Sequence, residues 1–132
     1  NKIHVQGHLG VLPQSQKGKC RVKGKKISKK LKILKDAKLL EKAGVFSIVL
    51  ECVKTSLAKK ITQELKIPTI GIGASSYCDG QVLVTDDLIG LNQINAKFVK
   101  KYSNITKEIN SAIIKFKKDV KGKKFPQKKH SY

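Results

Sequence analysis

Four short segments of the sequence hold residues that could do acid–base or binding chemistry. They are residues 7–10, 51–52, 73–76 and 86–87, which read Gly-His-Leu-Gly, Glu-Cys, Gly-Ala-Ser-Ser and Asp-Asp. Each follows a stretch whose residues favour a β-strand. In parallel α/β proteins the reactive residues gather at the carboxyl ends of the strands. The four segments are therefore candidates for one common site.

Glu51 is the strongest candidate for a catalytic group. It directly follows six mostly apolar residues, 45–50. A carboxylate in such surroundings is costly to desolvate unless it is paired or functional, and a carboxylate of this kind suits the work of a general base. A glutamate that turns into solvent at the strand end, or that pairs with a lysine, explains the spacing equally well.

His8 is the candidate binding residue. It lies between Gly7 and Gly10, so little side-chain bulk would keep a substrate from the imidazole. The ring could then form a hydrogen bond with a carboxylate or carbonyl group. Spacing alone favours a simpler role, in which the histidine bonds to the loop backbone.

The glycine-rich and aspartate segments have weaker claims. Residues 71–76 begin like a dinucleotide-binding fingerprint but end in serine, and no convincing helix follows. Their glycines more simply allow the backbone to approach a ligand or a neighbouring strand closely. Asp86 and Asp87 point to opposite faces of an extended chain. Metal binding or acid catalysis is open to one of them, but a carboxylate at a helix N-terminus is the simpler role.

Apolar runs and helical periodicity predict the elements that would position these residues. Buried strands are predicted at residues 3–6, 45–50, 67–72 and 81–84. Helices are predicted at 28–43, from Thr55 or Ser56 to Leu65, and along a C-terminal apolar stripe. Strands that alternate with helices form βα units and a parallel sheet. About four such units fit the chain, half of the eight in a (β/α)8 barrel, although an open three-layer sheet fits the same order.

The C-terminal stripe has apolar residues at helical spacing and lysines on the opposite face. This pattern favours a core or subunit contact over a helix that lies on a membrane. The members of the stripe are Phe98, Tyr102, Ile105, Ile109, Ala112, Ile113 and Phe116.

The composition indicates one globular domain with a strong positive charge. The chain has 132 residues, and no apolar run approaches the roughly 20 residues of a membrane span. Its 29 basic and 9 acidic residues give a net charge of +20, which makes a basic nucleic-acid-binding module the alternative function. However, 28 of the cations are lysines, and Arg21 is the only arginine. Base readout and phosphate clamping favour arginine, so we expect solvated lysines and no nucleic-acid partner.

The cysteines and the first residues bear on the cellular context. Cys20, Cys52 and Cys78 form no metal-ligand or disulfide pattern, so we expect free thiols in a reducing cytoplasm. No signal-peptide pattern opens the chain. The sequence contains no methionine, which predicts that it is a piece of a longer protein.

Seven blocks of the sequence match the motifs of one known family, in the same order and across nearly the whole chain. They are residues 7–15 (GHLGVLPQS), 49–53 (VLECV), 67–74 (IPTIGIGA), 79–84 (DGQVLV), 87–91 (DLIGL), 97–102 (KFVKKY) and the closing Phe125-Pro126 with His130-Ser131-Tyr132. In these blocks the chain resembles ketopantoate hydroxymethyltransferase. Members of this family are (β/α)8 TIM barrels, and the resemblance places residues 1–132 in the C-terminal half of the single domain, strands five to eight.

The resemblance implies an enzyme of pantothenate biosynthesis. The family transfers a hydroxymethyl group from 5,10-methylenetetrahydrofolate to α-ketoisovalerate, and its members are cytoplasmic homo-oligomers, with a decamer as the family's assembly. By the family's motifs, Glu51 is the proton acceptor and His8 lines the substrate pocket. Mg²⁺ polarises the ketone in this family, and its ligands belong to the N-terminal half, which is absent here. We therefore expect no metal ligand in this segment and no activity from it alone.

The chain departs from the family's pattern at several positions. These positions would lie in loops near the pocket mouth, where they bear on substrate affinity and loop closure. They are Leu12, Cys20, Lys54, Ser75 and Asp86.

Overall fold

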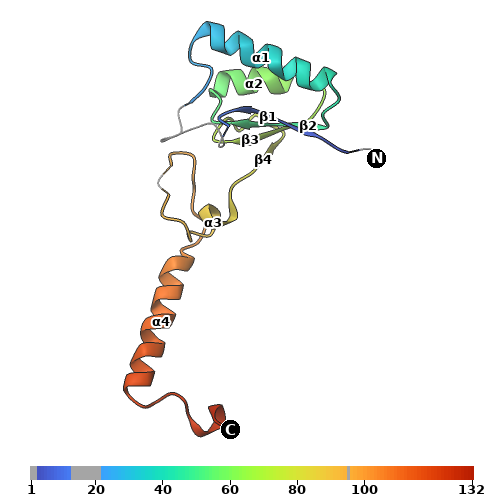
Figure 1. Cartoon of the computed structure of the whole chain (residues 1–132). Coiled ribbons are helices and arrows are strands. Elements are labelled where there is room, and N and C mark those ends of the chain that lie inside the picture. The colour runs from blue at the N-terminus through green and yellow to red at the C-terminus, as the bar shows by residue number, and fades with distance from the viewer. Residues whose placement is uncertain (1–2, 13–21, 95) are drawn as a thin grey trace. The chain divides into compact units, whose positions relative to one another are not determined.

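The computed structural model describes residues 3–12, 22–94 and 96–132 (Figure 1). The chain divides into two compact units, residues 1–83 with 96–98 and residues 84–95 with 99–132. The first unit holds β1 (Gln6–Gly10), α1 (Ile27–Lys42), β2 (Ser47–Glu51), α2 (Thr55–Glu64), β3 (Thr69–Ile72) and β4 (Gly80–Gln81). The second holds α3 (Thr85–Leu88), α4 (Ile105–Lys121) and a 3-10 helix at Lys128–His130.

The four strands of the first unit form one sheet in the order β1-β2-β3-β4, and every pair is parallel. In this register His8 lies opposite Val49, and Gly10 lies opposite Glu51. Glu51 in turn lies opposite Ile72 of β3. The predicted α/β class with a parallel sheet is confirmed.

Helices α1 and α2 lie on the same side of this sheet (Figure 1). Strands paired in chain order and joined by right-handed crossovers place their helices on one face. The core therefore forms between that face and the two helices. Ile48 and Leu50 of β2 are fully buried there, in one cluster with Leu57 and Ile61 of α2. Burial of such side chains is the main favourable contribution to folding of the unit.

The first strand differs from its prediction. It was expected at residues 3–6, with Gly7 as its end, but it runs from Gln6 to Gly10 and so contains His8. Gly7 is needed for close packing, because a Cβ there would lie 3.1 Å from Leu40 of α1 and 3.2 Å from Ile48. The sequence pattern indicated that the strand ends at Gly7, whereas in the structure Gly7 lies inside β1, where the strand approaches α1 closely. The strands predicted at 45–50 and 67–72 and both helices of this unit are confirmed with shifted ends. The strand predicted at 81–84 is largely wrong, because β4 is Gly80–Gln81 and shares only Gln81 with it.

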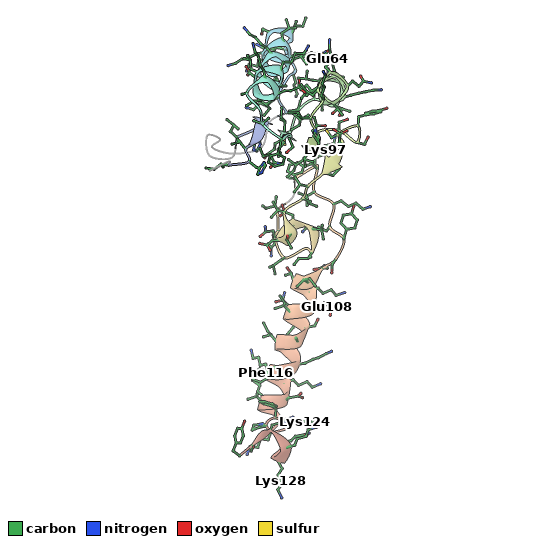
Figure 2. All side chains as sticks on the ribbon, turned by 90° about the vertical axis from the view of Figure 1, so that its right-hand side faces the viewer. Glu64, Lys97, Glu108, Phe116, Lys124 and Lys128 are labelled. Carbon is green, nitrogen blue, oxygen red and sulfur yellow. The ribbon has the colours of Figure 1, made fainter. Side chains whose placement is uncertain are left out.

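In the second unit, α3 begins beside Asp86 and Asp87, and the C-terminal helix starts later than the apolar stripe. Asn104 caps α4 by accepting a hydrogen bond from the Lys107 amide, so Phe98 and Tyr102 precede the helix. Side chains project around α4, Glu108 and Phe116 among them (Figure 2). No residue of α4 is buried, so the stripe residues on this helix are not core among the described residues.

The helices and the cysteines test two further expectations, on membrane spans and on free thiols. Among the described residues, none of the helices has the length and hydrophobicity that a membrane crossing requires. Cys78 is a buried free thiol, as expected. Cys52 is disulfide-bonded, so the expectation of free thiols is wrong there. Spacing along a chain does not reveal which cysteines the fold brings together.

Candidate active site

Glu51 and His8 meet at the carboxyl end of the sheet. Glu51 is the last residue of β2, and His8 is two residues before the end of β1. His8 Nε2 lies 3.1 Å from Glu51 Oε2. The Glu51 side chain is 15% exposed and that of His8 is 35% exposed, so both are open to a ligand from one side. The sequence predicted that these two residues would share a strand-end site, and the structure places them in contact.

The register explains why the two side chains share a face. Side chains alternate across a strand, so those of His8 and Gln6 lie on the opposite face from Gly7 and Leu9. On β2, Ile48 and Leu50 point into the helical core. Glu51 therefore points to the other face, and Ser47 lies there too, where it accepts a hydrogen bond of 2.8 Å from Gln6 Nε2. The contact between His8 and Glu51 therefore lies on the sheet face away from α1 and α2.

The backbone next to this pair is tightly constrained. Gly10 has a φ of 107°, and an ideal Cβ there would lie 2.0 Å from the backbone oxygen of Glu51. The same oxygen accepts a hydrogen bond of 2.9 Å from the Val11 amide. Cys52 has a φ of 51°, which non-glycine residues seldom adopt and which is common at functional sites. Positive φ values therefore occur on both sides of Glu51, at Gly10 on the paired strand and at Cys52 next in the chain.

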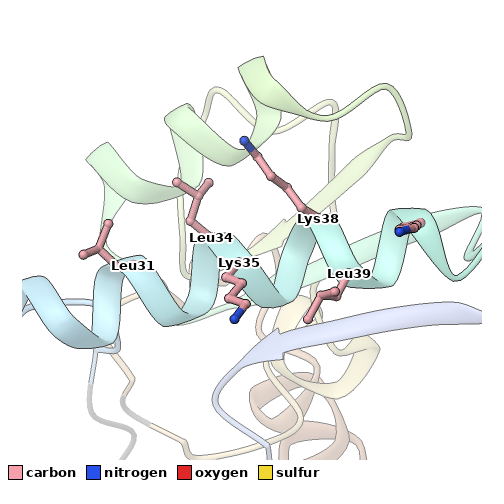
Figure 3. Close-up of a pocket in the computed structure, with 6 residues that line it drawn as sticks. Leu31, Leu34, Lys35, Lys38 and Leu39 are labelled. Carbon is pink, nitrogen blue, oxygen red and sulfur yellow. The ribbon is translucent and has the colours of Figure 1, made fainter.

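A pocket of about 340 Å³ opens beside His8. It combines apolar and basic groups from β1, the start of α1 and the segment before α1. Its lining consists of His8, Leu9, Gly10, Leu12, Lys23, Gly24, Lys29, Lys32, Ile33 and Asp36. A second pocket, of about 360 Å³, lies along α1, and its lining is formed by leucines and lysines (Figure 3). In that view Leu34 and Lys38 point towards α2, and Lys38 forms an ion pair of 2.6 Å with Glu64.

The glycine-rich segment serves the packing of its own loop. A Cβ on Gly71 would lie 2.8 Å from Gln81 Oε1, and Gly73 has a φ of 60°. Ser75 is buried, and its hydroxyl accepts a hydrogen bond from the Tyr77 amide. Thr55 Oγ1 also donates to the Ala74 carbonyl. The prediction of a close backbone approach is confirmed, and the partners are neighbouring side chains.

Asp86 and Asp87 occupy the first turn of α3, as the simpler interpretation predicted. Asp87 is buried and accepts a hydrogen bond of 3.1 Å from Asn92 Nδ2. These carboxylates belong to the second unit. Of the other departures from the family's motifs, Leu12 lines the pocket beside His8 and Lys54 is the N-cap residue of α2. Cys20 lies outside the described residues.

Sequence reasoning missed the structural role of Asp79. Its Oδ2 accepts hydrogen bonds from the Thr69 amide at 2.8 Å and from the Thr69 hydroxyl at 3.0 Å. These hydrogen bonds, the one from the backbone amide above all, lower the pKa of the Asp79 carboxyl below its usual value. Thr69 is fully buried at the start of β3. No spacing signal could have found this pair, because the loop after β3 creates it.

The described residues do not fit a magnesium site. No group of three or more His, Cys, Asp or Glu residues that could hold a metal ion occurs among them. Glu51 is paired with an imidazole, whereas Mg²⁺ prefers several oxygen ligands. No chemical step at this site is therefore assigned to a metal.

Comparisons with known proteins give a consistent family. The family model of ketopantoate hydroxymethyltransferase matches residues 1–128. The 3-methyl-2-oxobutanoate hydroxymethyltransferase of Pelagibacter ubique is 70% identical over 132 residues, which is 100% of this chain and 51% of that protein. Those of Thermosipho melanesiensis and Syntrophus aciditrophicus are 53% and 49% identical over 98% of this chain. The chain spans about half the length of these relatives. It belongs to the ketopantoate hydroxymethyltransferase family.

Proposed function

We propose that this chain is the C-terminal half of a (β/α)8 barrel that makes ketopantoate for pantothenate biosynthesis. The complete barrel transfers a hydroxymethyl group from 5,10-methylenetetrahydrofolate to α-ketoisovalerate. Four parallel strands in chain order, with α1 and α2 on one face, support half of such a barrel. A doubly wound sheet, in contrast, carries helices on both faces. Residues 1–132 then supply strands five to eight.

The observation that carries the proposed chemistry is the position of Glu51. Its carboxylate lies at the carboxyl end of β2, where the side chain is largely shielded and contacts His8, a residue that lines an open pocket. We propose that Glu51 removes the proton from C3 of α-ketoisovalerate. The C3–H bond breaks, the proton passes to the carboxylate, and the electron pair forms the enolate. C3 then bonds to the one-carbon unit of the folate, and the two bonds from that carbon to folate nitrogens break. Water supplies the hydroxyl group, and the C3 proton and the second water proton end on the two nitrogens, so that tetrahydrofolate leaves.

The remaining parts of the proposal concern binding and assembly. We propose that His8, which lines the pocket and contacts Glu51, also contacts the substrate. The Mg²⁺ ligands belong to the other half of the barrel. The complete enzyme is a homo-oligomer in the cytoplasm, and the exposed apolar residues of α4, such as Ile113 and Phe116, suit a subunit contact.

The test uses a chimera, the Pelagibacter ubique relative with its matching half replaced by this chain. Exchange of the C3 proton of α-ketoisovalerate with deuterated water, followed by NMR, isolates the proton-abstraction step from folate chemistry. Glu51→Gln keeps the shape of the side chain but cannot accept a proton. We expect exchange to fall by about 10²–10⁴-fold. Glu64→Gln, which alters a glutamate paired to Lys38 on α2, should leave exchange unchanged. Equal exchange in the parent chimera and Glu51→Gln would remove Glu51 from the mechanism.

A further inference from the structure

The Glu51 carboxylate has two oxygens in different surroundings. Oε2 lies 3.1 Å from His8 Nε2. Among the described residues, this contact through Oε2 is the one ion pair of the Glu51 carboxylate, and no hydrogen bond joins Oε1 to another of these side chains. A general base needs one oxygen directed at the proton that it removes. The geometry thus separates an oxygen that is held from an oxygen that is available.

A hydrogen bond from Nε2–H to Oε2 would fix the direction of the carboxylate. The Glu side chain has several rotatable bonds, and an exposed one samples several rotamers. A misplacement of about 1 Å can cost about 100-fold in rate, because the reacting atoms must lie near their attack distance. An imidazole that donates through Nε2 holds one oxygen and leaves the other for the substrate. The hydrogen on Nε2 is assigned from this contact.

The support for His8 comes from rigid strand backbone. Residues 6–10 of β1 pair in register with residues 47–51 of β2, so both side chains stand on the same two paired strands. Gly7 packs against Leu40 and Ile48, which fixes β1 against the helical layer. Sites built on paired strands hold their geometry better than sites built on loops.

We propose that His8 is a positioning residue for Glu51, in addition to lining the substrate pocket. The inference rests on the proposed function, because it assumes that Glu51 is the base. Its distinctive consequence is that His8 acts through Glu51. Loss of the imidazole ring should therefore lower the maximal rate of proton exchange. It should have no further effect on that rate in a variant whose residue 51 cannot accept a proton.

The first experiment measures C3 proton exchange in the chimera over a range of α-ketoisovalerate concentrations. We expect His8→Ala to lower the maximal exchange rate by about 10–100-fold, with a smaller change in the half-saturating concentration. His8→Gln carries an amide N–H near the position of Nε2, and it should restore most of the rate. His4→Ala is the matched control, because His4 is exposed and its ring faces Phe46. Far-UV circular dichroism checks that each variant is folded.

The second experiment is a double-mutant cycle, which separates this inference from the proposed function. If His8 acts through Glu51, the double variant His8→Ala with Glu51→Gln should exchange no more slowly than Glu51→Gln alone. Multiplied losses, or an effect of His8→Ala confined to the half-saturating concentration, would overturn the positioning role and leave Glu51 as the base. Undiminished exchange in Glu51→Gln would instead overturn the proposed function.

Discussion

Asp79 shows how one carboxylate can support a strand that it does not belong to. It accepts hydrogen bonds from both the amide and the hydroxyl of Thr69, which is fully buried. The Thr69 hydroxyl also shares a hydrogen bond of 2.8 Å with the hydroxyl of Thr62 on α2. Asp79 therefore joins the loop after β3 to the first residue of that strand and, through Thr69, to α2.

Replacing Asp79 tests this role in the chimera. Asp79→Ala leaves the buried Thr69 amide without its partner, so we expect a loss of about 1–3 kcal/mol in the free energy of unfolding at pH 7. Urea denaturation measures the loss. The matched control is Asp119→Ala, which alters an exposed aspartate on α4. Equal destabilisation by both changes would show that the contacts of Asp79 are not what stabilises the loop.

The same contact predicts a pH dependence. Hydrogen bonds from Thr69 lower the pKa of Asp79 in the folded state from its ordinary value of 3.8. A lowered pKa stabilises the fold at pH values above the unfolded-state pKa, and this contribution is lost as the pH falls through the folded-state pKa. The stability difference between the parent and Asp79→Asn should therefore persist from pH 7 to about pH 5 and shrink below pH 4. A difference that stays constant down to pH 3 would contradict the assignment.

At the scale of the elements, the pairing of the end of β1 with the end of β2 determines how His8 and Glu51 lie relative to each other. Gly10 and Glu51 are register partners, and Gly10 has the backbone conformation that favours glycine. An added Cβ would meet the Glu51 backbone oxygen at 2.0 Å, so the two strand ends would have to separate. Gly44, in the turn between α1 and β2, has a φ of 86°, but nothing lies within 4 Å of the same added atom.

This contrast gives a paired prediction for C3 proton exchange in the chimera. Gly10→Ala should reduce exchange by at least about tenfold, because moving the end of β1 shifts Glu51 and His8 relative to each other. Gly44→Ala should cost about 1–2 kcal/mol of stability from its positive φ and leave exchange intact. Denaturation and exchange are measured on the same samples. Full exchange in Gly10→Ala, or an equal loss of exchange in Gly10→Ala and Gly44→Ala, would show that the pairing of these two strand ends does not position the site.

The elements also show how far the sequence alone could lead. The continuous apolar run before Glu51 predicted β2 correctly, because a strand buried among helices leaves that signature. The predicted β1 lies too early in the sequence. A glycine can mark either a turn or a site of close packing, and Gly7, which was interpreted as the strand end, is a packing site inside β1. Site residues were predictable where they end a strand. Asp79 was not, since its partner Thr69 is ten residues away and only the folded loop joins them.

At the scale of the whole molecule, two features distinguish this chain. Its relatives are about twice as long. Its net charge is +20, and the exposed residues of α1 and α4 include many lysines. A net charge this far from zero opposes compaction through self-repulsion and makes the alternative, nucleic-acid binding, a natural hypothesis. Family membership accounts for the motifs without it, and solvated lysines then remain the simpler interpretation of the charge.

The last prediction concerns the 132-residue chain by itself. Among the described strands, β1 and β4 pair on one side only, and within the first unit α1 and α2 cover only the face opposite Glu51. Open parallel edges and a half-built barrel interior are unfavourable in water. We therefore expect the isolated chain to show no C3 proton exchange and to be stabilised by added salt, which screens its +20 charge.

Co-expression with the other half of the Pelagibacter ubique relative provides the decisive comparison. If the proposed barrel is correct, pairing the strand edges and enclosing the Glu51 face with the relative's other half should restore exchange. The same co-expression with Glu51→Gln in this chain should give a complex of equal stability and no exchange. That control separates assembly of the barrel from the chemistry of its base. A monomeric chain that melts cooperatively and exchanges the proton alone would contradict both the half-barrel interpretation and the need for a second half.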